Sequence, residues 1–464
     1  MSVLWTSADA EIATLGHAGR PFTATGLSID TRTLRPGDLF VALKGETRDG
    51  HDFVGAAFAA KAAAALVARA IPGIAADGPL LAVADTQRGL EDLARAARDR
   101  THAQVVAVTG SAGKTTTKEM LRLALGALGP THVSAASYNN HWGVPLSLAA
   151  LPQESAYGVF EIGMNHFGEI RALVGMVRPH VALVTTIAPA HLEFFGSCEA
   201  IADAKSEIFE GVLSGGAALV PADSPYADRL RARGRQAKLS RILSFGNAAR
   251  CDARLISLAD GDGVTKVEAE ILGRKLHFRI GAPGAHNAAN ALGALLAVAV
   301  LEGDVLNAAA ALSGFSALKG RGQRSEIAVA GGKVGLIDES YNANPASMEA
   351  ALANLGSASP APGARRVAVL GDMLELGPQG VLLHAGLAEA IEAARADLVF
   401  LCGTQMAALW DRLPASRRGA YGENSSDIAG AVANAIRTGD VVLVKGSLGS
   451  KMAAIVEALK APTA

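Results

Sequence analysis

The chain has 464 residues, with 43 basic and 44 acidic side chains and a formal net charge of −1. This balance argues against a nucleic-acid-binding or membrane-surface protein, which normally carries a basic excess. Half of the residues are hydrophobic and 19% are charged, which excludes extended disorder. At about 150 residues per domain, the length predicts three domains. Glycine is abundant, with 51 residues, as expected of many turns and of backbone-lined anion sites.

Three features indicate where the protein works. The start, Met1 to Trp5, lacks a basic segment followed by an apolar core, and so does not resemble a secretory signal. The longest apolar run, 291–301, is far shorter than the ~20 residues that cross a bilayer. The cysteines Cys198, Cys251 and Cys402 are scattered and form no CxxC pair. We expect a cytoplasmic protein with reduced thiols and no membrane insertion.

The first predicted domain covers residues 1–103. Short apolar runs at 38–43, 64–68 and 80–83 predict strands. Residues 88–100 predict a helix, because their apolar side chains recur at helical spacing. This block is a small α/β domain.

The second predicted domain covers residues 104–318. Its first strand, 104–108, is apolar throughout, as in parallel sheets buried on both faces. Strands and helices then alternate, which predicts a doubly wound, mostly parallel α/β sheet. The strands are predicted at 158–162, 181–187, 217–220 and 242–245, and the helices at 115–128, 167–177, 199–213 and 286–301. Alternating residues at 265–272 and 275–280 predict a small antiparallel appendage.

The third predicted domain covers residues 319–464. Strands predicted at 334–338, 366–370, 397–402 and 440–445 alternate with Ala-rich helices. This pattern indicates a second, Rossmann-like α/β domain.

The most specific motif is Val-Thr-Gly-Ser-Ala-Gly-Lys-Thr-Thr-Thr at 108–117, between a buried strand and a helix. In that setting, backbone N–H groups and the helix N-terminus attract phosphate oxygens. Lys114 can reach the β- and γ-phosphates, and Thr115 can offer its hydroxyl to Mg²⁺. The usual spacing is GxxxxGK[ST], but Val108 stands where the first Gly belongs, so the loop is shorter. The predicted ATP-binding residues are Gly110, Ser111, Ala112, Gly113, Lys114, Thr115 and Thr116.

The segment 109–118 resembles the ATP loop of the Mur ligases, the ATP-dependent amide ligases of peptidoglycan assembly. Other blocks resemble the family over nearly the full length: Asp30-Thr-Arg32, 36–45, 161–165, His191, 204–207, 286–290, 338–345, 371–373 and 445–447. Tyr-Asn-Ala-Asn-Pro at 341–345 and Asp-Gly-His-Asp-Phe at 49–53 resemble the branch that joins D-alanyl-D-alanine to a UDP-N-acetylmuramoyl tripeptide. The resemblance implies a ligase that works through an acyl phosphate and acts as a monomer, with no nucleic acid as partner.

The resemblance also implies a second Mg²⁺ held by Glu161 and His191. Glu161 ends a predicted buried strand, at the rim where open α/β sheets bind ligands. Taken alone, it could equally cap a helix, and His191 could be an ordinary loop histidine. Lys205 alone reads as a surface lysine, and the family implies that it is carbamylated by CO₂ and becomes a Mg²⁺ ligand.

Four further residues are implied at the nucleotide. Asn287 and Asn290 share a face near the start of a predicted helix, where two amides could contact adenine or ribose, although Asn287 could simply cap the helix. Arg321 and Asp338 match residues that close onto the nucleotide from the third domain in the family. Either could also be a surface charge.

The family implies that residues 1–103 bind the UDP part of the substrate, through Thr31 and Arg32. Thr31 replaces the serine that is usual in the family's Asp-Ser-Arg. Asn139 lies in a Gly/Pro-punctuated loop expected to face the sugar-peptide, and Asn342 and Asn344 are expected near the incoming dipeptide.

Two alternatives stay open from the sequence. Another amide ligase of the superfamily, such as a folylpolyglutamate synthase, would share the ATP loop and the modified lysine. It would not be expected to carry 338–345 or the N-terminal Asp-Thr-Arg block. A non-catalytic nucleotide-dependent switch is the alternative from another class.

Overall fold

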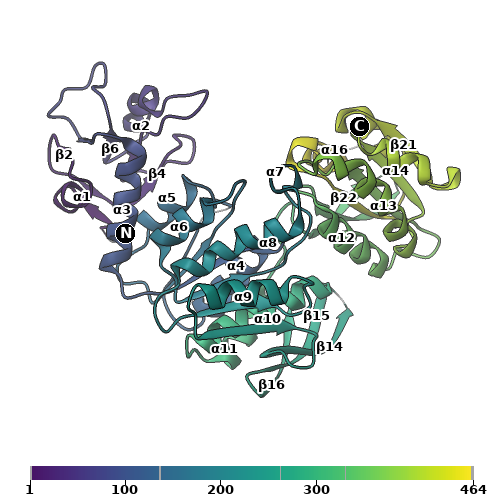
Figure 1. Ribbon diagram of the computed structural model, residues 1–464. Helices are drawn as coiled ribbons and strands as arrows, with labels where there is room; N and C mark the ends of the chain where they lie inside the picture. Colours follow the sequence, from purple (N-terminus) through teal and green to yellow (C-terminus); the bar gives the residue numbers. More distant parts are fainter. Residues whose placement is uncertain (1–2, 135–136, 262, 330, 461–464) are drawn as a thin grey trace.

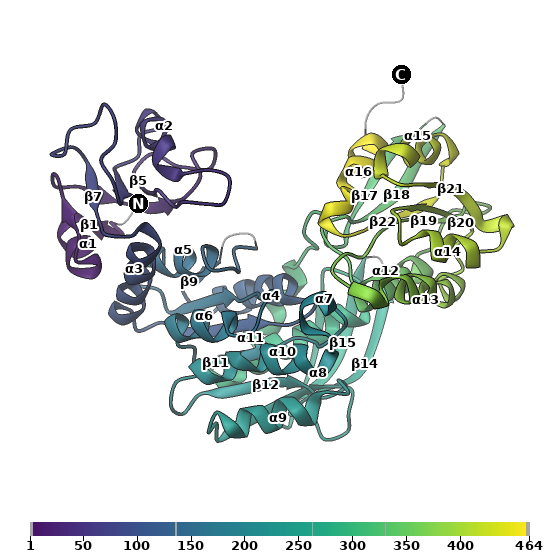
Figure 2. The ribbon, with the colours of Figure 1, turned by 45° about the horizontal axis from the view of Figure 1, so that its top comes forward.

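The computed structural model describes residues 3–134, 137–261, 263–329 and 331–460. Its three larger sheets each form the centre of an α/β unit. The N-terminal and C-terminal units lie at opposite ends of the central one, with open space between them (Figures 1 and 2). The predicted three-domain α/β fold is therefore present.

The N-terminal unit is built on a five-stranded sheet of order β2-β7-β6-β5-β4. Its elements are β1 (Trp5–Thr6), α1 (Ser7–Thr14), β2 (His17–Ala18), β3 (Thr23–Ala24), β4 (Gly26–Ser28), β5 (Asp38–Val41), α2 (Val54–Ala59), β6 (Ala64–Val67), β7 (Leu80–Ala82) and α3 (Thr86–Arg100). The three predicted strands are present. Helix α3 begins before the predicted residue 88 because Asp85 caps it, accepting a hydrogen bond from the Arg88 N–H at 2.8 Å. Helix α1 was not predicted, and it buries only Ala10, so it leaves almost no periodic apolar pattern.

The central unit is a nine-stranded sheet of order β16-β15-β14-β13-β12-β11-β8-β10-β9. Its strands are β8 (Gln104–Thr109), β9 (Thr131–Val133), β10 (Tyr157–Glu161), β11 (Val181–Val184), β12 (Ala217–Pro221), β13 (Arg241–Gly246), β14 (Ala253–Gly261), β15 (Val264–Ile271) and β16 (Arg274–Ile280). Its helices include α4 (Lys114–Gly126), α5 (Gly143–Ala149), α6 (Glu169–Val177), α7 (Leu192–Phe195), α8 (Cys198–Ser206), α9 (Ala227–Gln236), α10 (Ala285–Val300) and α11 (Val305–Ala311).

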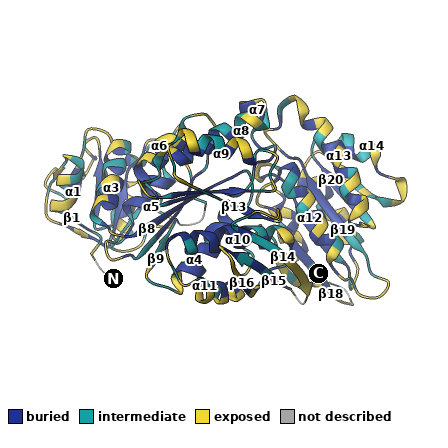
Figure 3. Cartoon of the chain, turned by 60° about the horizontal axis from the view of Figure 1, so that its bottom comes forward, coloured by how far each residue is buried: buried dark blue, intermediate teal, exposed yellow. Residues whose placement is uncertain are grey.

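Both faces of the parallel part of this sheet are covered. Figure 3 shows buried strands between two helical layers, with α6, α8 and α9 on one face and α4, α10 and α11 on the other. Alternate residues of β8 divide accordingly. Val105 and Ala107 pack in one core cluster, and Val106 and Val108 pack in the other. This two-sided burial explains why β8 is apolar throughout its sequence.

The predicted antiparallel appendage is not a separate element. Strand β14 pairs in parallel with β13, through Phe245 with Ala253 and Gly246 with Arg254, and β15 and β16 follow antiparallel. The segment therefore extends the central sheet. Helix α8 also differs from prediction, because it ends at Ser206 and the chain continues as the 3-10 turn Glu207–Gly211.

The C-terminal unit has a six-stranded sheet of order β17-β18-β22-β19-β20-β21. Its elements include β17 (Gln323–Val329), β18 (Gly332–Glu339), α12 (Pro345–Ser357), β19 (Arg366–Gly371), α13 (Gly380–Ala393), β20 (Leu398–Cys402), α14 (Ala407–Arg412), β21 (Arg418–Gly422), α15 (Ser425–Ala435), β22 (Val441–Lys445) and α16 (Ala453–Lys460). The four predicted strands are the inner ones. The two edge strands, β17 and β21, were not predicted, because both carry mostly exposed or half-buried residues.

Within the described ranges, no helix is both long enough and apolar enough to cross a membrane. The three cysteines are all free thiols.

Buried hydrogen bonds join the N-terminal unit to the central one. The Arg98 guanidinium on α3 donates to the carbonyls of Val177 at 2.8 Å and Arg178 at 2.9 Å, where α6 ends. The Trp5 indole N–H donates to the Ala149 carbonyl, at the end of α5, at 2.9 Å. These bonds satisfy carbonyls that a helix end leaves unpaired.

We predict that Arg98→Ala lowers the free energy of unfolding by about 2 to 4 kcal/mol, because it leaves two carbonyls without donors. Urea unfolding followed by circular dichroism measures the change. Arg88→Ala, an exposed arginine on the same helix, is the matched control and should change it by less than about 0.5 kcal/mol. Equal effects of the two variants would contradict this role for Arg98.

Candidate active site

Three strands of the central sheet end at one point. Strand β8 lies between β10 and β11, and all three run in parallel. Their carboxyl ends therefore bring together the Gly-rich loop after Thr109, the carboxylate of Glu161 and the hydroxyl of Thr185. A cleft of about 1110 Å³ opens here and extends to the C-terminal unit. This is the edge of an open α/β sheet at which ligands bind.

The Gly-rich loop requires glycine at two positions. Gly110 has φ +151°, and a Cβ there would stand 1.9 Å from Thr185 Oγ1. Gly113 has φ +81°, and a Cβ there would stand 2.7 Å from Asn290 Oδ1. Neither place admits a side chain, and residues 111–114 of the loop line the cleft directly where α4 begins at Lys114. The helix N-terminus adds partial positive charge, so the loop suits phosphate.

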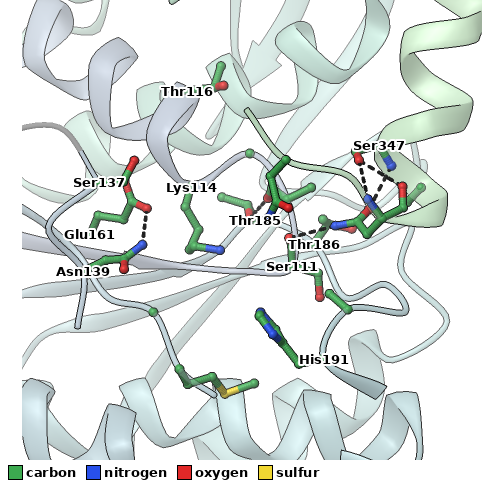
Figure 4. Close-up of a pocket in the computed structure, with 18 of the residues that line it drawn as sticks. Ser111, Lys114, Thr116, Ser137, Asn139, Glu161, Thr185, Thr186, His191 and Ser347 are labelled. Carbon is green, nitrogen blue, oxygen red and sulfur yellow. Dashed lines mark hydrogen bonds between the residues drawn. The ribbon is translucent and has the colours of Figure 1, made fainter. Parts of the chain in front are cut away.

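Lys114 is the first cation of the site. Its Nζ donates to the Gly110 carbonyl at 2.7 Å. Burial and the nearby charge of Arg321 lower the pKa of Lys114, while the charge of Glu161 acts in the opposite direction. In the view of Figure 4, Lys114 lies between Glu161 and Ser111. An anionic ligand in the cleft would favour its charged form.

Glu161 is 1% exposed, and both of its oxygens accept hydrogen bonds. Thr115 Oγ1 donates to Oε2 at 2.8 Å. Asn139 Nδ2 donates to Oε1 at 2.8 Å, as Figure 4 shows. A hydroxyl and a carboxylate held together beside a phosphate-binding loop are oxygen ligands of the kind that Mg²⁺ prefers. The residues at this point therefore fit Mg²⁺.

His191 lines the same cleft, but its imidazole pairs with Glu375 and not with Glu161. It adopts φ +59°, and its Nδ1 pairs with a carboxylate oxygen of Glu375 in the C-terminal unit. This contact lowers the pKa of Glu375. Within the described part of the chain, no three His, Cys, Asp or Glu residues gather as a metal site. The role of His191 as a Mg²⁺ ligand with Glu161 thus stays a prediction.

Lys205 lies on α8 and is only 1% exposed. Its amine forms no hydrogen bond or ion pair with any residue that the structure describes. Burial, together with the charge of Lys114, holds the pKa of Lys205 well below its usual value. This shift favours the neutral amine more than in a solvated lysine, and the neutral amine is the form that can react with CO₂.

The other predicted nucleotide residues divide into two pairs. Asn290 and Arg321 line the cleft. Asn287 does not line it, since its amide donates to the Pro283 carbonyl at 2.7 Å. Asp338 is also buried away from the cleft, and its carboxylate accepts from the Gly320 N–H at 3.2 Å and from Ser340 Oγ at 2.6 Å.

The predicted substrate residues divide in the same way. Asn139, Asn342 and Asn344 line the cleft. The side chain of Asn344 caps α12 and also donates to the Ser111 carbonyl of the phosphate-binding loop at 3.2 Å. Thr31 and Arg32 lie outside the cleft, and the exposed guanidinium of Arg32 pairs with Asp30.

Sequence reasoning missed two residues that contact this machinery. Glu375 comes from a loop two residues after Met373, and nothing in its spacing indicates a partner 184 positions away. Tyr341 belongs to the quoted 341–345 block, yet its ring was given no role. It stacks on the Arg321 guanidinium at 3.9 Å.

Comparisons with known proteins identify the family. Residues 108–298 match the Mur ligase middle domain, and residues 320–448 match the "Mur ligase, glutamate ligase domain". Residues 23–104 match the "Mur ligase family, catalytic domain". The chain belongs to the Mur ligase family.

Similar proteins extend over nearly the whole chain. The UDP-N-acetylmuramoyl-tripeptide–D-alanyl-D-alanine ligase of Escherichia coli is 38% identical, over 95% of this chain and 95% of that protein. The ligase of the same name from Bacillus subtilis is 35% identical, over 94% and 93%. The crystal structure of MurF from Acinetobacter baumannii superposes with a TM-score of 0.85 at 30% identity, covering 99% of each chain. The Thermotoga maritima MurF ligase in complex with ADP gives 0.78 at 26% identity, over 94% and 97%.

We predict that Lys205→Met raises the free energy of unfolding of the unliganded protein by about 1 to 3 kcal/mol in CO₂-depleted buffer. The folded chain disfavours the Lys205 ammonium. The increase in the free energy of unfolding that the substitution gives is therefore largest at low pH, where Lys205 is charged in both states. It shrinks as the pH rises through the lowered folded pKa of Lys205 towards the usual 10.5. Urea unfolding at several pH values measures it.

Lys118→Met is the matched control, because Lys118 is equally buried but donates to the Ser134 carbonyl at 2.9 Å. That variant should lose stability. A Lys205→Met protein that is less stable than the wild type at low pH would contradict the account of the lysine.

Proposed function

We propose that the chain joins D-alanyl-D-alanine to UDP-N-acetylmuramoyl-tripeptide with ATP, giving the pentapeptide, ADP and phosphate for peptidoglycan synthesis. The observation that carries the proposal is full-length similarity to ligases of that name. The phosphate-binding loop and Glu161 line one cleft, and the buried Lys205 is near enough to Lys114 for the charge of Lys114 to act on it. The proposed N-terminal domain, 1–103, binds UDP. Residues 104–318 bind ATP, and residues 319–464 form the C-terminal domain. The protein acts as a cytoplasmic monomer.

The chemistry has two steps. The terminal carboxylate of the tripeptide attacks the γ-phosphorus, the bond to ADP breaks, and an acyl phosphate forms. The amine of the dipeptide then attacks the acyl carbon, a proton leaves the amine, and phosphate departs as the amide forms. Backbone N–H groups of residues 110–113 and the Lys114 ammonium hold the phosphates and oppose the charge that develops. Thr115 and Glu161 would hold Mg²⁺, which supplies further positive charge at the phosphates.

Lys205 takes part as its carbamate in this proposal. Its lowered pKa leaves the amine able to attack CO₂, which forms an N–C bond and releases a proton. The product is an anion, and its charge would attract the Lys114 ammonium, whose charge already acts on Lys205. Its oxygens would also join Thr115 and Glu161 as ligands for the metal.

The C-terminal domain completes the site. Asn344 donates to the loop at Ser111, Arg321 donates to Ser137 Oγ at 2.9 Å, and Glu375 pairs with His191. These contacts join the domain to the central one across the cleft. We propose that they exclude water, because an acyl phosphate hydrolyses readily.

A folylpolyglutamate synthase from Mycobacterium tuberculosis covers 81% of this chain at 18% identity, with a TM-score of 0.62. That likeness concerns the fold alone. The match of residues 23–104 to a Mur ligase domain supports the peptidoglycan substrate instead.

We predict that the purified protein releases phosphate from ATP only when both UDP-N-acetylmuramoyl-tripeptide and D-alanyl-D-alanine are present. A coupled phosphate assay, with each component omitted in turn, tests this, and mass spectrometry identifies the pentapeptide. Turnover that is indifferent to both acceptors would reject the proposal, and turnover with a folate and glutamate would favour the folylpolyglutamate alternative.

We predict that Lys205→Ala lowers kcat by about 10²- to 10⁴-fold, because the carbamate oxygens are lost. Added formate should restore part of the rate, since the truncated side chain leaves room for a small carboxylate. Lys205→Arg is the control, because it fills that space and should not respond to formate. Unchanged activity in Lys205→Ala would refute the role of the carbamate.

A further inference from the structure

The segment that leads into the C-terminal domain presents Arg321 to the cleft beside an aromatic ring. The guanidinium stacks over the Tyr341 ring, with 3.9 Å between the guanidinium carbon and the ring centroid. It also donates to Ser137 Oγ at 2.9 Å. Arg321 and Tyr341 both line the cleft. Among the described residues, no carboxylate pairs with Arg321, so its charge remains available to an anion in the cleft.

Backbone hydrogen bonds join the segment that carries Arg321 to the segment that carries Tyr341. The Tyr341 N–H donates to the Gly320 carbonyl at 3.0 Å, and the Gly322 N–H donates to the Asp338 carbonyl at 2.8 Å. The Asp338 carboxylate accepts from Gly320 on one segment and from Ser340 on the other. Arg321 and Tyr341 therefore leave the backbone from neighbouring, fixed points.

The ring limits where the guanidinium can go. An arginine side chain loses rotamer freedom when it is ordered, and a flat aromatic surface favours a guanidinium stacked upon it. Tyr341 is 37% exposed, and its hydroxyl forms no hydrogen bond with any described residue. Tyr341 therefore contacts Arg321 through the face of its ring. Lys114 and Arg321 both line the cleft, and the charge of Arg321 acts on Lys114.

We propose that Tyr341 is a positioning residue that holds Arg321 in place for the terminal phosphate of ATP. The inference rests on the proposed function, because it takes ATP as the anion between Lys114 and Arg321. Arg321 then contacts the γ-phosphoryl group together with Lys114, while Tyr341 acts only through Arg321. Asp338 and Gly320 keep the two side chains together.

Tyr341→Leu tests the proposal, with Tyr341→Phe as the conservative variant that keeps the ring. We expect Tyr341→Leu to lower kcat by about five- to tenfold and to weaken binding of a non-hydrolysable ATP analogue by a similar factor. ADP affinity should change by less than about twofold, because ADP lacks the terminal phosphate. Tyr341→Phe should restore the wild-type values to within about twofold. Isothermal titration calorimetry gives the two affinities without turnover.

Two further variants separate positioning from general damage. In the Arg321→Ala background, Tyr341→Leu should cause no additional loss of analogue affinity. Tyr421→Leu removes a tyrosine that is equally exposed, at 36%, on β21 of the same domain outside the cleft. It should leave analogue affinity unchanged. If Tyr341→Leu does not fold, Tyr341→Ser is measured in its place.

The proposal is overturned if loss of the ring weakens the analogue equally in the presence and absence of Arg321. It is also overturned if ADP and the analogue lose affinity to the same extent, or if neither does. Failure of the proposed function looks different, because the wild type would then release no phosphate with both acceptors present. In that case, the calorimetric comparison still decides whether Tyr341 positions Arg321.

Discussion

The interaction on which the site depends is repulsion among basic side chains beside the phosphate-binding loop. Lys114 and Lys205 are close enough to lower the pKa of Lys205, and Arg321 acts on Lys114 in the same way. The carboxylate of Glu161 acts on Lys114 in the opposite direction, and Thr115 and Asn139 already occupy its oxygens. Repulsion between basic groups in a partly buried site is relieved when an anion binds among them. The triphosphate, and on our proposal the carbamate of Lys205, are the anions that complete this site.

The domain arrangement serves the same requirement. The N-terminal domain is fastened to the central one by buried bonds, among them those of Arg98 and Trp5. The C-terminal domain reaches the cleft through a few polar contacts, at Ser111, Ser137 and His191. Contacts of this kind are easier to break and remake than a packed core.

Much of the fold could be predicted from the sequence because its central strands are buried on both faces. In the sequence, β8 is an apolar run, and the loop after it is marked by Gly, Lys and Thr. The strand and the loop both occur where the sequence predicts them. Edge strands β17 and β21 could not be predicted, since their side chains are largely solvated and follow no strong pattern. The antiparallel strands β14 to β16 were recognised as a unit, but their continuity with the central sheet depends on the pairing of Phe245 and Gly246 with β14.

The site was predictable only in part for a related reason. Loop residues 110–116 can be recognised from residue type and spacing. The sequence around Lys205 does not distinguish it from a surface lysine, because its burial and its closeness to Lys114 are properties of the fold. Glu375 pairs with His191 across domains, and Tyr341 stacks on Arg321 from a separate segment of the same domain, and neither contact leaves a local sequence pattern. Asn287 and Asp338 were predicted at the nucleotide from their residue types. In the structure their side chains instead form hydrogen bonds with backbone groups of Pro283 and Gly320.

The central claim is that the tripeptide carboxylate is phosphorylated before the amide forms. The most direct test uses UDP-N-acetylmuramoyl-tripeptide with ¹⁸O in its terminal carboxylate, followed by mass spectrometry of the released phosphate. Our account predicts that one labelled oxygen passes to each phosphate, because cleavage of the acyl phosphate leaves the former carboxylate oxygen on phosphorus. Phosphate without label, released while the pentapeptide forms, would contradict it.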